Sequence, residues 1–118
     1  MKTELTNAGI TVLNKDDSQE SPNMDAVELA SYEVDPSVVA VVVGVDPNMT
    51  YRKIAIASLY IQLNKAMFIA SNTDRNCGVG DRLPPAGGVC VKAVEVATGV
   101  KPRVMGKPDP FALQLIQK

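Results

Sequence analysis

The apolar residues of this chain gather in two short runs, with a longer segment of helical character between them. The first run spans 38–45 and reads VVAVVVGV, and the second spans 66–70 and reads AMFIA. A short, continuous run rich in β-branched residues is typical of a strand buried on both faces within a parallel sheet. Residues 49–64 connect the two runs and favour a helix. The spacing therefore predicts a parallel βαβ unit.

Polar residues follow each predicted strand. Asp46 ends the first, and 71–74, SNTD, follow the second. Ligands of open α/β sheets bind outside the carboxyl ends of the strands, so this edge is the expected functional one. The stretch 71–88 holds four glycines and two prolines. A loop of this length within a small domain is often functional.

The helix expected at 49–64 has apolar residues on two sides. We expect one stripe to pack on the sheet and the other to need cover from a partner chain. Isolated exposed isoleucines are also common, so both interpretations of the second stripe remain open. The sheet stripe is Ala55, Ile56, Leu59 and Leu63, and the second stripe is Ile54, Ala57 and Ile61.

The later part of the chain predicts a second helix near 86–98 that stops at Gly99, followed by a short strand at 103–105. With the βαβ unit these elements predict an α/β fold, in which a small mixed sheet is covered by the two helices. A further helix is expected from Asp109 onwards.

The earlier part of the chain is less regular. Residues 1–13 hold the end of a helix that stops at Gly9 and a short strand candidate from Ile10 to Leu13. Residues 14–37 form an acidic loop, in which Ser21 and Pro22 are able to start a brief helix. Asp46 is expected to cap the helix that begins near 49.

Composition removes several classes of function. The chain of 118 residues fits one domain, and it contains no histidine. Serine-histidine triads, cysteine-histidine dyads and the usual zinc sites are therefore excluded. Cys77 and Cys90 form no CxxC motif, and two reduced thiols are expected.

Charge and hydropathy narrow the partners and the location. The net charge of −1 gives no general argument for nucleic acid or a membrane surface. No run is long enough to span a membrane and no signal peptide is visible, so we expect a soluble, cytoplasmic protein. Residues 71–118 carry seven basic residues against four acids, which suits an anionic ligand near the later loops, although ordinary scatter of surface charge explains it equally well.

Five sequence blocks, taken in order, resemble a known family. They resemble the p-nitrophenylphosphatase and phosphoglycolate phosphatase group of the haloacid dehalogenase superfamily, whose typical blocks are DPxVxAVVVGxD, TYxKL, FIATNxD, PGAG and VGKPxP. The blocks here, spread over about two thirds of the chain from Asp35 onwards, are DPSVVAVVVGVD, TYRKI, MFIASNTD, PPAGG and VMGKPDP.

The resemblance implies a location within a larger enzyme. In that group a catalytic core carries an aspartate nucleophile in a DxDG motif and binds Mg²⁺, and a large α/β cap is inserted before the lysine block. The blocks present here are those of the cap and the lysine at its exit. The resemblance therefore implies a connection at 1–13, the acidic loop at 14–37, the cap at 38–105 and the return to the core from 106 to 118.

The acids of the chain agree with a missing core. Phosphoryl transfer through an aspartyl-phosphate needs a nucleophilic carboxylate, a second carboxylate as acid or base, and a magnesium site. No two aspartates lie two positions apart, so the nucleophile motif is absent. We expect the chain alone to be inactive, with Mg²⁺ held by the missing catalytic core and no metal ligand in this chain.

The resemblance also implies roles for individual residues. Lys107 matches the lysine that neutralises the transferred phosphoryl group. Residues 75–83 match the loop that sets specificity for a small phosphorylated substrate, and within it Arg75, Cys77 and Arg82 are the expected contacts. Asn72 and Asp74 match an Asn-x-Asp pair that braces this loop. PAGGV stands where PGAGS is usual, which leaves the substrate undetermined.

Two other functions fit parts of the pattern. A free-standing α/β interaction module would form a homodimer through the 49–64 helix, and this overlaps with the first interpretation because caps of this group also mediate dimer contacts. A nucleotide-binding βαβ domain is disfavoured because no glycine-rich turn follows either strand.

Overall fold

The fold contains a small sheet and two long helices, with two short helices earlier in the chain. The computed structural model describes residues 2–13 and 20–106. Lys107 and the helix predicted from Asp109 lie outside the described residues, as does 14–19 of the acidic loop. In chain order the elements are α1 (Lys2–Asn7), α2 (Ala26–Ser31), β1 (Ala40–Val43), α3 (Tyr51–Leu63), β2 (Met67–Ala70), α4 (Gly87–Thr98) and β3 (Arg103–Val104).

The predicted βαβ unit is confirmed. β1 pairs with β2 in parallel with Val41 opposite Phe68, and β2 pairs in parallel with β3, so the order is β1-β2-β3. The α/β fold is therefore as expected, but the sheet within the described residues is parallel throughout and not mixed. Both crossovers are helical, which is the connection that parallel neighbours require.

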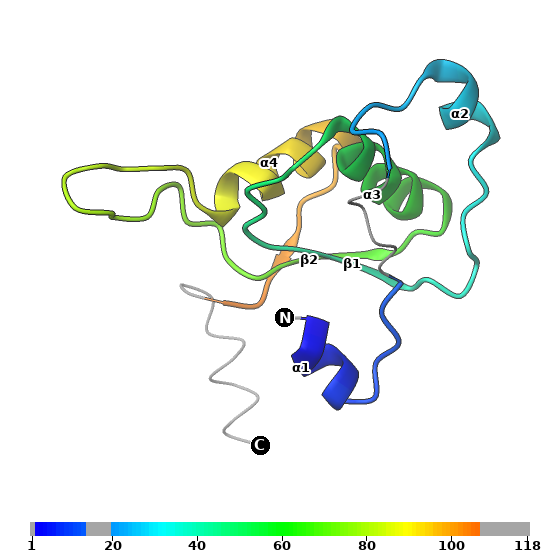
Figure 1. The fold of residues 1–118 in the computed structure, drawn as a ribbon. Helices are drawn as coiled ribbons and strands as arrows, with labels where there is room; N and C mark the ends of the chain where they lie inside the picture. The colour runs from blue at the N-terminus through cyan, green and yellow to red at the C-terminus, as the bar shows by residue number, and fades with distance from the viewer. Residues whose placement is uncertain (1, 14–19, 107–118) are drawn as a thin grey trace.

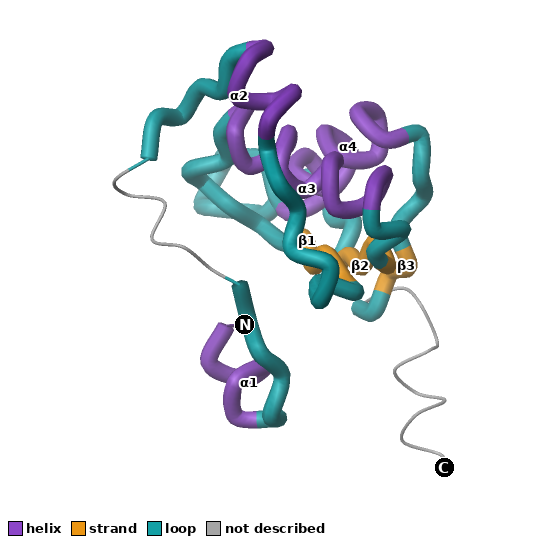
Figure 2. The backbone as a smooth tube through the Cα atoms, turned by 90° about the vertical axis from the view of Figure 1, so that its right-hand side faces the viewer, coloured by secondary structure: helices purple, strands orange, loops and turns teal. Residues whose placement is uncertain are grey.

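Both long helices lie on one side of this sheet, while α1 lies on the other (Figures 1 and 2). The core fills the space between the helices and the sheet. Residues of β1, β2, α3 and α4 compose it: Val43, Ile61, Phe68, Ala70, Cys90, Val91 and Val94. Aliphatic side chains dominate the core because the chain has no tryptophan and only two phenylalanines.

The prediction that β1 is buried on both faces is wrong within the described structure. Val43 on the helix side is 8% exposed, whereas its neighbour Val42 is 37% exposed and Met67 of β2 is 52% exposed. The alternation follows from the two-residue period of a strand, because only one face of the sheet has helices packed on it.

The assignment of stripes on α3 is also wrong. Ile61 of the second stripe is 4% exposed and Ala57 packs against the core, whereas Leu63 of the stripe expected on the sheet is 61% exposed. The inward face of α3 is set by contact with both β1 and α4. An apolar pattern on two sides of a helix contains no information on which side that is.

The segment before β1 differs from the expectation in two places. α1 ends near Gly9, whose φ of 78° is the predicted left-handed stop. Ile10–Leu13 forms no strand among the described residues, because a strand needs an available sheet edge and none is paired with it. The loop from 20 to 37 contains α2, which begins after the N-cap Asp25 and not at Ser21.

The segment after β2 follows the prediction closely. α4 ends at Gly99, with a φ of 68°, and the short final strand is present as β3.

Within 2–13 and 20–106, no helix has the length and hydropathy needed to cross a bilayer.

Candidate functional site at the carboxyl edge of the sheet

The three strands end side by side, and the residues that follow them form one edge. The Ser71 amide donates to the Val43 carbonyl at 3.0 Å, and the Met105 amide donates to the Ala70 carbonyl at 2.9 Å. Gly106 is packed so closely on the Ser71 carbonyl that no side chain fits there. The described part of the chain therefore ends at this edge with Gly106, and Lys107 lies outside the described residues.

Asn72 organises the turn after β2. Its Oδ1 accepts a hydrogen bond from the Asp74 amide at 3.1 Å, which is an Asx turn. Asp74 takes part through its backbone, since its carbonyl accepts from the Gly88 amide at 2.8 Å. The two residues thus connect the end of β2 to the first turn of α4.

Residues 75–86 form a hairpin arm that extends away from the sheet and helices (Figure 1). Antiparallel bridges join Asn76 to Pro85 and Val79 to Arg82. The tip is a two-residue turn, in which Gly80 has a φ of 59°. A glycine with positive φ at the first turn position is typical of tight hairpins. The predicted long loop is therefore an ordered arm whose base is the Asn72 turn.

The predicted substrate contacts are spread along this arm. The Arg75 carbonyl accepts from the Ala86 amide at the base, at 3.2 Å. Cys77 is exposed in the middle, and its amide donates to the Pro84 carbonyl at 3.0 Å. Arg82 lies next to the tip, with Nε 3.4 Å from Asp81 Oδ1 and both side chains largely exposed. Arg75 thus lies at the base of the arm and Arg82 next to its tip, so the two arginines do not form one cluster.

Asp46 does not cap α3. Thr50 is the N-cap, with Oγ1 accepting from the Lys53 amide at 3.2 Å. Asp46 Oδ1 instead accepts from the Asn48 amide at 2.8 Å, and Oδ2 accepts from Lys53 Nζ at 2.8 Å. The carboxylate lies four residues before the N-cap and is bound by the turn that leads into the helix.

The pKa of Asp46 reflects this environment. Partial burial acts to raise the pKa, but the hydrogen bonds from Lys53 and the Asn48 amide, with the Lys53 charge, together outweigh it and hold the pKa below its ordinary value. Asp46 is therefore a fixed anion at neutral pH whose neighbour Lys53 already balances its charge.

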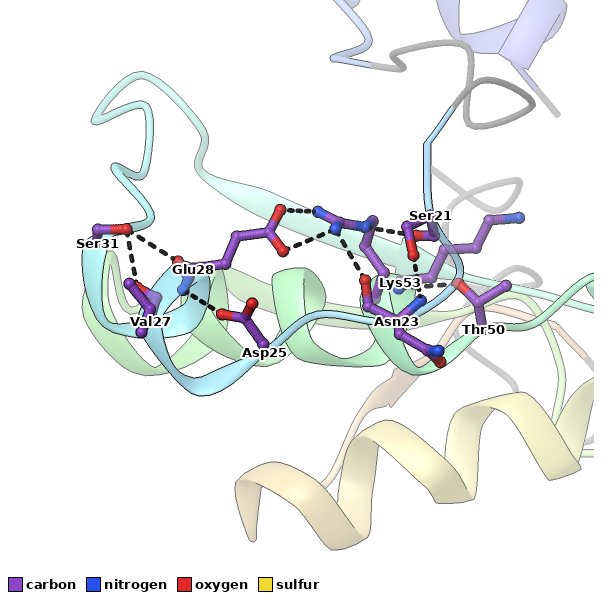
Figure 3. Close-up of polar contacts among 9 residues, drawn as sticks. Ser21, Asn23, Asp25, Val27, Glu28, Ser31, Thr50 and Lys53 are labelled. Atoms are coloured by element: carbon purple, nitrogen blue, oxygen red, sulfur yellow. Dashed lines mark hydrogen bonds and ion pairs between the residues drawn. The ribbon is translucent and has the colours of Figure 1, made fainter.

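The sequence reasoning missed Arg52. Its guanidinium makes a bidentate pair with Glu28 at 2.6 and 2.8 Å, and it also donates to the Ser21 and Asn23 carbonyls at 2.6 and 2.8 Å. Figure 3 shows Ser21 beside the start of α3 and Glu28 of α2 farther along this helix, with the Glu28 carboxylate pointing back towards the start. The only available signal was a basic first turn of α3 facing an acidic loop earlier in the chain.

The described edge does not fit a magnesium ion. Among the described residues, no three Asp, Glu, Cys or His side chains lie close enough to hold a metal together. The Asp46 carboxylate already forms an ion pair with Lys53. Mg²⁺ takes several oxygen ligands in an octahedral arrangement, which this edge does not offer.

The chain is similar in sequence to known proteins. No protein-family model matches the chain. The acid sugar phosphatase of Staphylococcus aureus strain USA300 is 34% identical over 113 residues, which is 96% of this chain and 36% of that protein. The chain therefore spans about a third of the length of this relative.

Three solved structures share the fold. NagD from Escherichia coli aligns over 97% of this chain and 36% of its own, with a TM-score of 0.66 and 25% identity. A thermostable p-nitrophenylphosphatase from Bacillus stearothermophilus aligns over 70% and 32%, with a TM-score of 0.62 and 30% identity. A glycerol phosphate phosphatase from Mycobacterium tuberculosis, solved with magnesium, aligns over 66% and 23%, with a TM-score of 0.59 and 35% identity.

Most of the matched proteins have similar activities in their names, and this chain covers a similar share of every one. The Staphylococcus aureus, Bacillus stearothermophilus and Mycobacterium tuberculosis proteins are phosphatases by name, and in every comparison the matched part is between 23% and 36% of the other protein. The chain is thus related to the haloacid dehalogenase-type phosphatases of the p-nitrophenylphosphatase group, and its coverage of about a third of their length is consistent with a cap-domain fragment of such a protein.

Proposed function

We propose that this chain forms the substrate-specificity cap of a phosphatase that hydrolyses small phosphate monoesters. The observation that carries the proposal is the hairpin arm at the carboxyl edge of the sheet. The arm is braced at its base by Asn72 and Asp74, and it carries the positive charge of Arg75 and Arg82 into solvent. A cap needs such a surface to meet a substrate held by another domain.

The proposed chemistry is divided between this chain and the rest of a longer protein. A guanidinium binds phosphate or carboxylate oxygens through paired hydrogen bonds, so Arg75 and Arg82 select anionic substrates, and Cys77 lies between them along the arm. Lys107 follows the edge and would neutralise charge that develops on the transferred phosphoryl group. The nucleophilic aspartate and the Mg²⁺ ligands belong to the catalytic core outside this chain.

A second function rests on α3. An interaction module that dimerises through this helix would have to use the stripe containing Leu63, because Ala57 and Ile61 of the other stripe pack in the core. Leu63 is 61% exposed, which gives this alternative one supporting observation.

The test compares the chain alone with a chimera. The matched third of the Staphylococcus aureus relative is replaced by residues 1–118, and turnover of p-nitrophenyl phosphate and of sugar phosphates is measured with and without Mg²⁺. We expect no turnover by the isolated chain and Mg²⁺-dependent turnover by the chimera.

Substitutions on the arm then test the assigned roles. Arg82→Ala in the chimera should raise KM for anionic sugar phosphates about tenfold, the cost of one charge-assisted hydrogen bond. Lys101→Ala removes an exposed cation that lies off the arm and should leave KM unchanged. Mg²⁺-dependent turnover by the isolated chain, or equal KM values for both variants, would contradict the proposal.

A further inference from the structure

The hydrogen bonds of the hairpin arm fix which of its side chains share a face. The Val79 amide donates to the Arg82 carbonyl and the Arg82 amide donates to the Val79 carbonyl, both at 3.0 Å. The Cys77 amide donates to the Pro84 carbonyl two residues nearer the base, also at 3.0 Å. The antiparallel bridge nearer the base continues this pairing. The arm therefore keeps one register from its turn to its base.

This register divides the arm into two faces. Directly paired residues of an antiparallel hairpin lie on the same side, and side chains alternate along each strand. One side, which we call the arginine face, carries both guanidinium groups and the thiol of the arm: Arg75, Cys77, Val79, Arg82 and Pro84. The other side is made of four described residues without charge: Asn76, Gly78, Leu83 and Pro85. The residues expected to contact a substrate thus share one face, although they are spread along the arm.

Val79 places apolar surface next to the charge of Arg82. It is opposite Arg82 in the last pair before the turn, and it is 62% exposed. The Cβ atoms of directly opposed residues are about 4.5–5.5 Å apart, so a ligand that reaches this guanidinium also meets the valine. The only acid in the described arm, Asp81, lies in the turn, and its 3.4 Å pair with Arg82 is largely exposed. Such a pair is weak, so an anionic ligand competes with it readily.

We propose that the arginine face selects phosphate monoesters whose leaving group carries a hydrocarbon portion next to a second anionic group. Val79 contacts the hydrocarbon portion and Arg82 binds the anion. The inference rests on the proposed function, and it names the class of substrate. A carboxylate binds a guanidinium through paired hydrogen bonds, and a hydrocarbon edge removes the valine from water, so a substrate with both groups uses both residues at once. A polyol phosphate would place hydroxyl groups against the valine, where they lose their hydrogen bonds to water.

The experiment compares three phosphate esters in the chimera. p-Carboxyphenyl phosphate offers a hydrocarbon ring and a carboxylate, phenyl phosphate offers the ring alone, and glycerol phosphate offers neither. Val79→Ser should lower kcat/KM about fivefold for both aryl esters and leave glycerol phosphate unchanged, because methyl groups that pack on the ring are lost. Arg82→Gln should lower kcat/KM about tenfold for the carboxylated ester relative to phenyl phosphate.

Leu83→Ser is the matched control. Leu83 is 72% exposed and lies on the other face of the arm, so its loss should leave kcat/KM unchanged for all three esters. An active chimera in which Val79→Ser and Leu83→Ser have equal effects, or in which Val79→Ser affects glycerol phosphate as much as phenyl phosphate, overturns the proposal and leaves the proposed function intact.

An inactive chimera contradicts the proposed function, and a binding measurement then decides the substrate class. p-Carboxybenzylphosphonate, which is not hydrolysed, replaces the esters, and calorimetry measures its Kd. Weaker binding after Val79→Ser than after Leu83→Ser supports the arginine face. Equal Kd values for the two variants, or no binding by the chimera, overturn it.

The isolated chain supplies a test of the face that needs neither activity nor the chimera. Cys77 is exposed and Cys90 is buried, so thiol reagents report the surroundings of Cys77. Neighbours two positions along a strand or diagonal to it lie about 7–8 Å away, within the Debye length of about 10 Å at 0.1 M salt. Relative to free cysteine, an anionic sulfonatoethyl methanethiosulfonate should therefore be favoured about threefold over its cationic trimethylammonium analogue.

The thiol introduced by Leu83→Cys in a Cys77→Ser background is the comparison on the other face. Its preference for the anionic reagent should be smaller than that of Cys77, and Arg82→Gln should reduce the preference at Cys77. Equal preferences at the two positions would show that the guanidinium groups do not share a face with Cys77, and the proposal would be wrong.

Discussion

Gly88 and Thr73 approach each other so closely that no other residue fits at position 88. A Cβ atom at Gly88 would lie 2.6 Å from the Thr73 carbonyl oxygen and 2.7 Å from that of Asp74. The same glycine donates its amide to Asp74 at 2.8 Å. This contact fixes α4 against the end of β2, and with it the base of the hairpin arm.

Gly88→Ala should therefore destabilise the domain, although alanine is the better helix former. Backbone atoms on both sides must move to admit the methyl group, and overpacking of this kind costs about 1–3 kcal/mol. The free energy of unfolding in urea measures it. Gly78→Ala is the comparison, since a Cβ there meets nothing within 4 Å and should change stability little. Equal stability of the two variants would show that the junction is loose.

The sheet and the helices of this domain follow from local sequence. Short apolar runs identified β1 and β2, and Gly99 identified the end of α4, because these signals act within a few residues. The arm was predicted as a long loop from its glycines and prolines, but its hairpin pairing was not. That pairing depends on Val79 and Arg82 meeting across a turn. The residues between Arg75 and Ala86 show no alternating apolar pattern that would indicate two strands.

Longer-range features were not predictable in the same way. The phase of α3 is decided by its packing on β1 and α4, and both of its sides are apolar enough to be buried. Thr50 was overlooked as the N-cap because Asp46 is also a good capping residue. The pair of Arg52 with Glu28 joins residues 24 positions apart, and no sequence spacing identifies such a partner.

Lys65→Gly should stabilise the domain. Lys65 follows the C-cap of α3 with a φ of 55°, and it is the only described non-glycine residue with positive φ. A side chain in the left-handed region costs about 1–2 kcal/mol, and glycine removes this strain. Glycine also loses more conformational entropy on folding, which offsets part of the gain, so a net increase in stability of about 0.5–1 kcal/mol is expected.

The free energy of unfolding in urea measures this gain. The opposite substitution, from glycine to a residue with a side chain, is made at the end of α4. Gly99, the C-cap of α4, is also left-handed, with a φ of 68° and open space around it, so Gly99→Ala should lose about 1 kcal/mol through backbone strain alone. A loss of stability in Lys65→Gly would mean that the lysine side chain contributes more than its conformation costs.

Arg52→Lys should release the segment that contains α2 while leaving the core folded. Lysine cannot reproduce the bidentate pair with Glu28 together with the bonds to the Ser21 and Asn23 carbonyls. Limited proteolysis should therefore cut within 20–32 faster than in the original chain, at an almost unchanged thermal midpoint. Lys92→Ala, which breaks the exposed pair with Glu95, should leave the cleavage rate unaltered. Identical cleavage of all three proteins would argue that Arg52 does not hold the segment.

Asp46→Asn should make the stability of the domain less sensitive to acid. The pKa of Asp46 in the folded chain lies below its ordinary value of 3.8, since the bonds from Lys53 and Asn48 outweigh the effect of burial. A depressed pKa contributes stability that is fully present above the unfolded value and is lost as the pH falls through the folded value. The asparagine variant should accordingly be less stable than the original at pH 6, and the difference should shrink below about pH 3.8 as the original takes up its proton.

Denaturant unfolding at a series of pH values measures that difference. Asp81→Asn provides the parallel case, because Asp81 is exposed near the tip of the arm and its nearest cation, Arg82, is equally exposed. Its effect should be small at every pH. A difference between Asp46→Asn and the original chain that stays constant from pH 6 to pH 3 would show that the carboxylate acts through packing and not through its charge, and Lys53 would then not be its electrostatic partner.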